Sequence, residues 1–600
     1  MQNHSVLTTS NPMFTVNNMD EKRNPVIILP GINHSQTFLY DENDCPVLDK
    51  NGNAIGGSML FADTDAAREK LTGLIKKLAL VSVIQNSEFV YERAYDVGCA
   101  AFSYQKCNMS GDHVNNLKTL RWHSPISKLS EEDKAWVYAM VPMQRLTEIY
   151  GEDNFYFFTF NLVGDPMKHA QDLDLYINNV LASTESEKVT LVPISLGGTI
   201  LAAYLDVYGH EKIDKIVNLV ACLDGTPLAA DMFIQDFNFD EGFLHHEFLE
   251  TVFKEIKGSG TTAYLINTAL HLLPEEAFNQ ALSGFVNSLL DTVVLNCPQF
   301  WAMVPSTRYD ELSLKLISDA AHSVLKQRTD RFQTARLNLK DNLLKAKADG
   351  VKVNFISGSN LNFGEKMYSF FGIIKEAKRY NSDGIISLAS TTLGATGGAN
   401  GSKLPDSYIQ DAAQAGRTLD YISPDGRIDA STAVIPDNTW IFLDQYHEVG
   451  RNDAVINLAT ALITGEIDDV HSDPEKYPQF NYFCETYILR RRKIPDAEKI
   501  LKEIDEGTLP CSESRRALVQ AALDEGKNVI SLTVGDNERA IKACENIDAV
   551  IKDLGRAPQP KKESKKEIFI EEFTKVISES SMKHLGGGNI VDKIKSKFRK

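Results

Sequence analysis

The sequence predicts an α/β fold in which a mostly parallel sheet is flanked by helices. Three stretches support this prediction, because each begins with the short apolar run of a buried strand. Residues 24–31 (NPVIILPG) run into a polar turn, residues 189–192 precede a segment with helical spacing, and residues 439–443 precede a helix expected at 453–465. Strands that alternate with helices along one chain indicate parallel pairing. The chain has 600 residues, 43% of them hydrophobic, which is enough for a large core and more than one domain.

The most informative stretch is residues 190–199, TLVPISLGGT, which places Ser195 between a strand and a helix. We expect Ser195 at the tip of a tight turn, where its hydroxyl stands clear of the sheet and the first amides of the helix stay free. Gly197 and Gly198 provide the small residues that such a nucleophile elbow needs, whereas Pro193 stands where a glycine is usual. A serine here can equally be a structural turn, so other segments must decide.

The polar turn after the first strand, INHSQ at residues 32–36, is a candidate oxyanion loop. In hydrolases with a nucleophile elbow, a loop after an early strand supplies one backbone N–H, and the residue after the nucleophile supplies the other. These amides are expected to be those of Ile32 and Leu196. Each such donor is worth about 3 kcal/mol of transition-state stabilisation. The alternative interpretation is an ordinary strand–loop junction.

Two downstream segments supply a candidate acid and a candidate base. Asp383 lies in NSDGIISLAS, where a loop changes to an apolar run, and His447 follows the third strand, just before a helix that Asn452 could cap. The resulting order of serine, acid and histidine is that of α/β-hydrolases and differs from chymotrypsin-like and subtilisin-like folds. Asp224, in ACLDGTP after another strand-like run, is an alternative acid.

Seven segments together resemble the lecithin:cholesterol acyltransferase family of lipases and acyltransferases, and they cover about residues 24 to 465 in the family's order. They are NPVIILPGI from residue 24, FYFFTFNLVGDPMKHA from 155, VTLVPISLGG from 189, LDGTPLAA from 223, CPQFWAMVPS from 297, SDGIISLAS from 382 and YHEVGRND from 446. The chain departs from the family at Pro193, and at residues 160–162, where the family usually has aspartate, tryptophan and arginine. Carried over by position, the resemblance implies these roles: Ser195 as nucleophile, Asp383 as acid, His447 as base, and Ile32 with Leu196 as oxyanion amides.

The activity implied by the resemblance is ester hydrolysis or acyl transfer on a lipid-like ester. Ser195 becomes a nucleophile when His447 accepts its proton, and Asp383 fixes the imidazole tautomer, so that an acyl-enzyme forms. Water or an alcohol can then accept the acyl group, and the sequence does not distinguish hydrolase from acyltransferase. The alternative function is a catalytically silent protein on the same fold that binds a lipid or a partner, and Pro193 favours this alternative.

The chain is expected to divide into a hydrolase core interrupted by a cap, followed by smaller parts. An amphipathic helix over residues 281–294 is expected in the cap, packed against the core or forming a lid over the site. The predicted parts are a flexible segment at 1–23, a core at 24–225 and 346–465, a helical cap at 226–345, a C-terminal helical domain at 466–558, and a linker with a basic tail at 559–600.

Composition limits the classes of binding partner and the cellular location that we expect for this chain. The net charge of −18 argues against nucleic-acid binding, because no basic face is evident over the candidate catalytic region. No cofactor or metal motif is present, so neither is expected. Without a signal-like start or an apolar run of membrane-spanning length, cytoplasmic residence with reduced cysteines is expected. The tail NIVDKIKSKFRK is either a solvated end or a basic amphipathic segment that contacts an anionic membrane.

Overall fold

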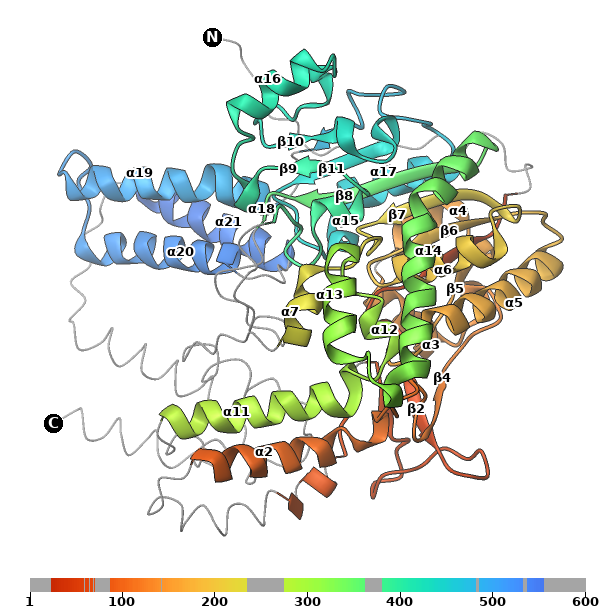
Figure 1. The fold of residues 1–600 in the computed structure, drawn as a ribbon. Coiled ribbons are helices and arrows are strands. Elements are labelled where there is room, and N and C mark those ends of the chain that lie inside the picture. The colour runs from red at the N-terminus through yellow and green to blue at the C-terminus, as the bar shows by residue number, and fades with distance from the viewer. Residues whose placement is uncertain are drawn as a thin grey trace.

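The computed structural model describes residues 23–58, 60–63, 65–67, 69–70, 87–141, 143–234, 275–361, 380–481, 485–531 and 537–554. In these residues a seven-stranded sheet, parallel throughout, forms the centre of the molecule (Figure 1). The predicted α/β-hydrolase fold class is thereby confirmed. The strands, in spatial order, are β12 (Phe480–Asn481), β11 (Thr439–Leu443), β8 (Lys352–Ser359), β7 (Ile213–Leu219), β6 (Val189–Pro193), β1 (Val26–Leu29) and β5 (Phe155–Phe157).

The strands are apolar along their whole length because both faces of the sheet are covered. In β1, Ile27 and Leu29 belong to the core on one face, whereas Val26 and Ile28 belong to the core on the other. All four side chains are buried. Continuous apolar runs of this kind are typical of parallel sheets with helices on each side, which explains why the predicted strands lack a polar face.

Two sets of helices form the layers over the sheet. The side chains of each set share a hydrophobic cluster with strand residues of the face that it covers. One layer consists of α5 (Pro166–Thr184), α6 (Gly197–Tyr208) and α14 (Ser323–Ala348); the other consists of α3 (Glu131–Met140), α4 (Gln144–Tyr150) and α17 (Asp453–Thr464).

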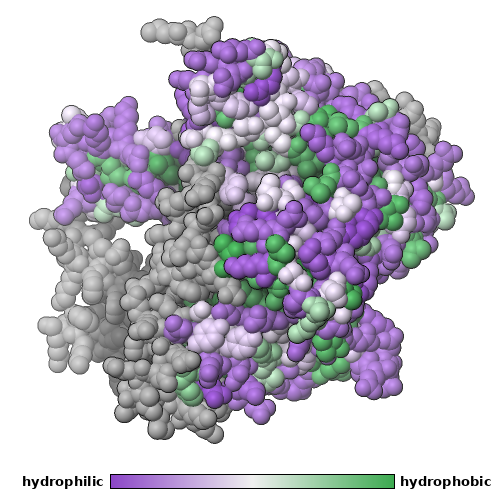
Figure 2. Space-filling model, viewed as in Figure 1, coloured by the Kyte–Doolittle hydropathy of each residue, from purple (hydrophilic) through white to green (hydrophobic). Residues whose placement is uncertain are grey.

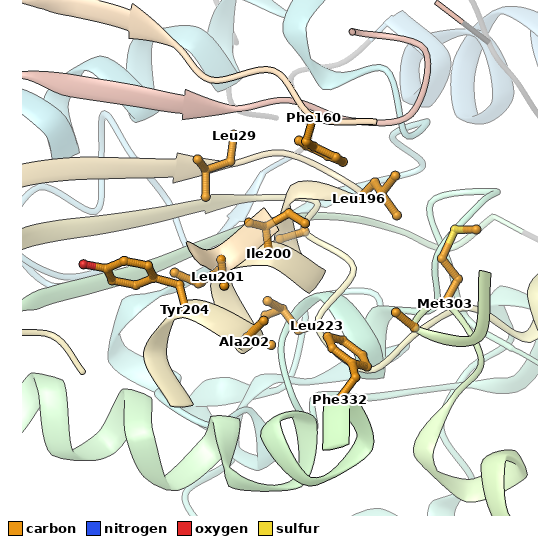
Figure 3. Packing of buried hydrophobic residues seen from close by; sticks show 14 of the residues in the cluster. Leu29, Phe160, Leu196, Ile200, Leu201, Ala202, Tyr204, Leu223, Met303 and Phe332 are labelled. Atoms are coloured by element: carbon orange, nitrogen blue, oxygen red, sulfur yellow. The ribbon is translucent and has the colours of Figure 1, made fainter. Parts of the chain in front are cut away.

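Helix α6 is the central element behind the candidate nucleophile. It is buried from Gly197 to Leu205, since it packs against the sheet, α5 and α14. Figure 3 shows α6 between the end of β1, marked by Leu29, and α14, marked by Phe332. Burial on several sides holds the start of α6 in a fixed position. Because residue 195 lies in the turn before this helix, its geometry is fixed as well.

Two elements belong to the sheet core although their residues fall in ranges predicted for other parts of the chain. Helix α14 falls mostly within the range predicted for the cap, yet it packs on α6 as part of the layer that flanks the sheet. Strand β12 falls in the range predicted for the C-terminal domain, yet it pairs with β11 at the edge of the central sheet. Both placements follow from long-range packing, which a division by sequence position does not detect.

The expected amphipathic helix is present as α11 (Glu275–Leu289), continued by a π-helical turn, Leu290–Val294. It lies along α2 (Ser87–Ala101), as Figure 1 shows. The two helices approach closely at Gly284, where a Cβ would lie 2.3 Å from the carbonyl oxygen of Tyr91. The other α-helices that the structure describes between β7 and β8 are α7 (Pro227–Ile234), α12 (Pro298–Trp301) and α13 (Ser306–Leu316).

Smaller elements surround this framework. Between β8 and β11 the described residues include two short α-helices and an antiparallel strand pair, and a three-stranded antiparallel sheet lies near the start of the chain. These elements are α15 (Leu388–Thr391), α16 (Asp406–Gln414), β9 (Thr396–Gly397) and β10 (Ile428–Asp429), with β2 (Thr37–Tyr40), β3 (Gly56–Gly57) and β4 (Asn116–Thr119) in the three-stranded sheet.

The C-terminal helices have a hydrophobic cluster of their own, to which Leu501, Val519 and Ile547 each contribute from a different helix. The helices are α18 (Glu485–Ile488), α19 (Ile494–Asp505), α20 (Glu513–Ser531) and α21 (Asn537–Leu554). The basic tail predicted at 559–600 and the segment predicted at 1–23, except for its last residue, lie outside the described residues, so the membrane contact stays a prediction. The seven described cysteines are unpaired.

The visible surface of the described residues is mostly hydrophilic, with smaller hydrophobic areas between the polar ones (Figure 2). None of the helices in the described ranges combines the length and the apolar character needed to cross a bilayer. The hydrophilic surface agrees with the large number of charged residues in the sequence, 81 acidic and 63 basic.

Candidate active site

Ser195 occupies the turn between β6 and α6 in a conformation that few residues adopt. Its φ is +50°, in the left-handed region that residues other than glycine rarely adopt. The turn is possible because Gly197 can approach β1: a Cβ at this position would lie 2.2 Å from the carbonyl oxygen of Leu29. Backbone strain of this kind costs on the order of 1–3 kcal/mol and is concentrated at functional sites. The expected elbow is therefore present in the backbone.

Pro193 does not interrupt the sheet before this turn. The register between β6 and β1 continues through the pair Leu29 and Pro193, and the Ile194 amide donates to the Leu29 carbonyl over 2.8 Å. The Ser195 amide then donates to the carbonyl of Leu219 in β7 over 3.2 Å. The missing N–H of proline is thus tolerated at the end of the strand. The residues that follow it keep their hydrogen bonds to β1 and β7.

His447 joins the serine to the acid predicted from the sequence. Its Nε2 lies 2.8 Å from Ser195 Oγ, and its Nδ1 lies 2.7 Å from Asp383 Oδ2. Because a carboxylate can only accept, Nδ1 carries the hydrogen, which leaves the lone pair of Nε2 facing the hydroxyl. The His447 amide also donates to the Asp383 carbonyl over 2.9 Å, so backbone and side chain are both held by the same residue.

Asp383 is fully buried, and both of its carboxylate oxygens have partners. While Oδ2 accepts from His447, Oδ1 accepts from the amides of Ile385 at 3.0 Å and Ile386 at 2.8 Å. Backbone donors of this kind fix the orientation of a carboxylate. The carboxylate can therefore orient the imidazole of His447 without turning.

Asp224, the alternative acid, has different partners. Its Oδ1 accepts from the Ser306 amide and its Oδ2 from the Ser306 hydroxyl, each over 3.0 Å, and the Nε of the buried Arg336 lies 3.9 Å from Oδ1. Arg336 in turn donates to the carbonyls of Ala302 and Val304. These contacts tie the start of α13 to the layer formed by α14. The structure thus places Asp224 in a structural ion pair and brings Asp383 to the histidine.

The two expected oxyanion amides belong to segments next to the serine. Leu196 is the residue that precedes the first turn of α6, and Ile32 follows Gly31, whose hypothetical Cβ would lie 3.5 Å from Ser195 Oγ. Neither the Ile32 nor the Leu196 amide donates a backbone hydrogen bond to a described residue. Both amides can therefore donate to a developing oxyanion, and the position of Leu196 at the start of α6 further favours negative charge.

Sequence reasoning did not single out two polar residues that lie next to these candidate residues in the chain. His34, in the same turn as Ile32, accepts a hydrogen bond at Nδ1 from the Gly31 amide over 3.2 Å. Tyr446, immediately before His447, donates its hydroxyl hydrogen toward the carbonyls of Val529 at 3.0 Å and Ile530 at 2.7 Å. A polar side chain in the predicted oxyanion turn was the available signal for His34. No local pattern could reveal the contact of Tyr446 with α20.

A separate polar cavity of about 670 Å³ lies between β4 and the start of α5. It is lined by cations such as Arg121 and Lys168 and by anions such as Asp112 and Asp172, which pair with one another. Ser195, Asp383 and His447 do not line it. In the described ranges, no group of three or more histidine, cysteine, aspartate or glutamate residues is arranged to hold a metal ion.

Comparison with known proteins gives distant similarity to solved structures. No protein-family model matches the chain, and neither does any curated protein sequence. Among solved structures, a chain from the crystal structure of the Tle4-Tli4 complex is similar at 13% identity, covering 74% of this chain and 99% of that one, with a TM-score of 0.29. A similarity of this size says nothing about the activity of the present chain.

Proposed function

We propose that this protein is a serine hydrolase or acyltransferase that acts on a lipid-like ester through an acyl-enzyme intermediate. The observation that carries the proposal is the continuous contact from Ser195 Oγ to His447 Nε2, at 2.8 Å, and from His447 Nδ1 to Asp383 Oδ2, at 2.7 Å. A serine hydroxyl needs a base within hydrogen-bond distance, and the base needs a third group to orient it. Both conditions are met, by three residues from separate segments of the chain.

In the proposed first step, Ser195 Oγ attacks the ester carbonyl carbon while His447 Nε2 takes its proton. The carbonyl π bond opens to an oxyanion, and the imidazolium is stabilised by Asp383, which itself stays ionised. Collapse of the intermediate expels the alcohol, which takes its proton from His447. The acyl group is then bound to Ser195 as an ester.

The second step repeats this chemistry with a new nucleophile. Water or an alcohol gives its proton to His447 and attacks the acyl-enzyme, and Ser195 leaves with the proton returned from the imidazolium. The amides of Ile32 and Leu196 are the proposed donors to the oxyanion in both steps, and loss of one such donor typically costs 100-fold to 1,000-fold in kcat. The same residues serve hydrolysis and transfer.

The lipid-like character of the substrate rests on the family resemblance of the sequence. Apolar side chains near the elbow support it, because Leu196 and Phe160 lie at the same end of the sheet as the serine (Figure 3). Phe160 stands at a position where the family usually has a polar residue. We therefore propose an acyl chain as the group that binds beside Ser195.

A fluorophosphonate probe tests the proposal directly, since it reacts only with an activated serine. We expect the full-length protein to be labelled and Ser195→Ala to remain unlabelled. Ser183→Ala, which changes an exposed serine on α5, serves as the matched control and should label like the wild type. A protein that binds lipid without turnover, the alternative function, would stay unlabelled in all three forms, and that result would reject the enzyme.

A further inference from the structure

The turn formed by residues 31–34 lies against the candidate nucleophile. A Cβ placed on Gly31 would be 3.0 Å from Ser195 Cβ and 3.4 Å from His34 Nδ1. The serine and the imidazole of His34 therefore both lie close to this glycine. Any movement of this turn changes the position of the Ile32 amide, which lies between Gly31 and His34 in the chain.

His34 closes this turn with two reciprocal contacts. The Gly31 amide donates to His34 Nδ1 over 3.2 Å, and the His34 amide donates to the Gly31 carbonyl over 3.4 Å. The second distance is long for a backbone hydrogen bond, so the side-chain contact is the stronger of the two. Without the imidazole, the turn would keep only the weaker contact between its ends.

The residues on either side of His34 are anchored separately. Asn33 has a φ of +71° and its Oδ1 accepts from the Ser58 hydroxyl over 2.7 Å. The Ser35 hydroxyl accepts from the Phe160 amide over 3.2 Å. These contacts attach the loop to the surrounding structure, whereas the imidazole of His34 fixes the shape of the turn itself.

The protonation state of His34 suits this role. Burial, and the proximity of His447, lower the pKa of His34 to about 4, so the imidazole is neutral near pH 7. A neutral ring can accept at Nδ1, where Gly31 donates, and then carries its hydrogen on Nε2. A charged ring would lose the acceptor, and it would oppose the positive charge that His447 gains during the reaction.

We infer that His34 is a positioning residue of the oxyanion loop: by accepting from the Gly31 amide, its imidazole holds the turn in which the Ile32 amide is presented to the substrate oxygen. This inference rests on the proposed function and adds to it a residue that does not itself touch the reacting atoms. Preorganised donors stabilise an oxyanion because they need no reorientation during the reaction. A loose turn would lose that advantage.

Three variants of His34 separate the acceptor from the bulk of the side chain. His34→Asn keeps an acceptor oxygen at the place of Nδ1, His34→Gln moves its amide one bond further along, to the place of Nε2, and His34→Leu keeps volume without any acceptor. We expect Asn to retain most activity and the other two to lose it. Thermal unfolding of each variant establishes whether the protein is folded.

The decisive measurement compares an oxygen ester with its thiono analogue, whose sulfur is a poor hydrogen-bond acceptor. If His34 positions an oxyanion donor, His34→Leu and His34→Gln should lower kcat for the oxygen ester by about 100-fold. The thiono ester, which gains little from the donors in the wild type, should lose only a few-fold, while KM for both changes little. His34→Asn should restore the oxygen-ester rate to within about tenfold of the wild type.

Two results would overturn the inference. One is an equal loss for both esters, which indicates general damage to the site, and the other is an unchanged oxygen-ester rate in His34→Leu. If His34→Leu fails to fold, the kcat values of His34→Asn and His34→Gln on the two esters provide the same test. Failure of the proposed function itself looks different, because the wild type would then be unlabelled by the fluorophosphonate and inactive on either ester.

Discussion

Replacing Asp383 by asparagine should lower turnover steeply, because the new side-chain amide can take only one orientation. Oδ1 of Asp383 accepts from the amides of Ile385 and Ile386, while Oδ2 faces His447 Nδ1 at 2.7 Å. In Asp383→Asn, the carboxamide oxygen must take the place of Oδ1, since an NH₂ group cannot accept from the two backbone amides. The NH₂ group is therefore directed at His447.

The consequence is the wrong imidazole tautomer. An NH₂ group at the place of Oδ2 donates to Nδ1, so Nδ1 must hold the lone pair and Nε2 must carry the hydrogen. His447 Nε2 then cannot accept the proton of Ser195. A tautomer error of this kind lowers kcat by about 10,000-fold in a serine triad, equivalent to about 5 kcal/mol of activation free energy. The residual rate comes from binding and the oxyanion amides.

Steady-state hydrolysis of a chromogenic ester measures the loss, and urea unfolding shows whether the fold survives. Asp224→Asn is the matched control, because Asp224 was the alternative acid and contacts Ser306 and Arg336 instead. It should keep kcat within a few-fold while losing about 1–3 kcal/mol of stability, since the buried Arg336 loses its charged neighbour. Full activity in Asp383→Asn, or inactivity in a folded Asp224→Asn, would refute the reasoning.

Two further predictions concern stability. In Tyr446→Phe, the two α20 carbonyls that the hydroxyl contacts lose their donor, which should cost about 1–2 kcal/mol and increase the release of the C-terminal helices in limited proteolysis; unchanged cleavage would contradict this. Burial lowers the pKa of His34, His113 and His169 to about 4, below the ordinary 6.5. Between these values only the unfolded chain binds the protons, so the free energy of unfolding should fall as the pH drops from about 6.5 to about 4. Urea unfolding at several pH values checks this, and His169→Gln should reduce the slope; an equal slope would exclude His169 as a contributor.

Local sequence determined the elements that carry the chemistry. The apolar run before Ser195, with Gly197 and Gly198 after it, was sufficient to predict a strand, a tight turn and a helix, because a close approach to β1 excludes a side chain at residue 197. The helix after His447 was predicted with its cap, and Asn452 Oδ1 does accept from the Ala454 amide over 2.9 Å. Both features depend on neighbours within a few residues.

Other features were settled by packing between distant segments. Asp224 and Asp383 are each followed by a glycine and lie beside an apolar run, so their local sequences are alike, and only the arrangement of the sheet decides which carboxylate meets His447. The same holds for α14, whose polar and apolar pattern fits a cap as well as a layer over the sheet. It holds also for β12, whose two residues are too few to show a strand pattern.

By itself, the sequence determined the fold class, the elbow and the order of the three candidate residues. These follow from backbone sterics, from hydrophobic spacing and from the order of the chain. The tertiary structure alone decided that Ser195, His447 and Asp383 come within hydrogen-bond distance, that His34 accepts from the Gly31 amide, and that Tyr446 contacts α20. The physical reason is that hydrogen bonds act over about 3 Å, whereas a sequence specifies neighbours along the chain and leaves contacts across it to the packing of the whole core.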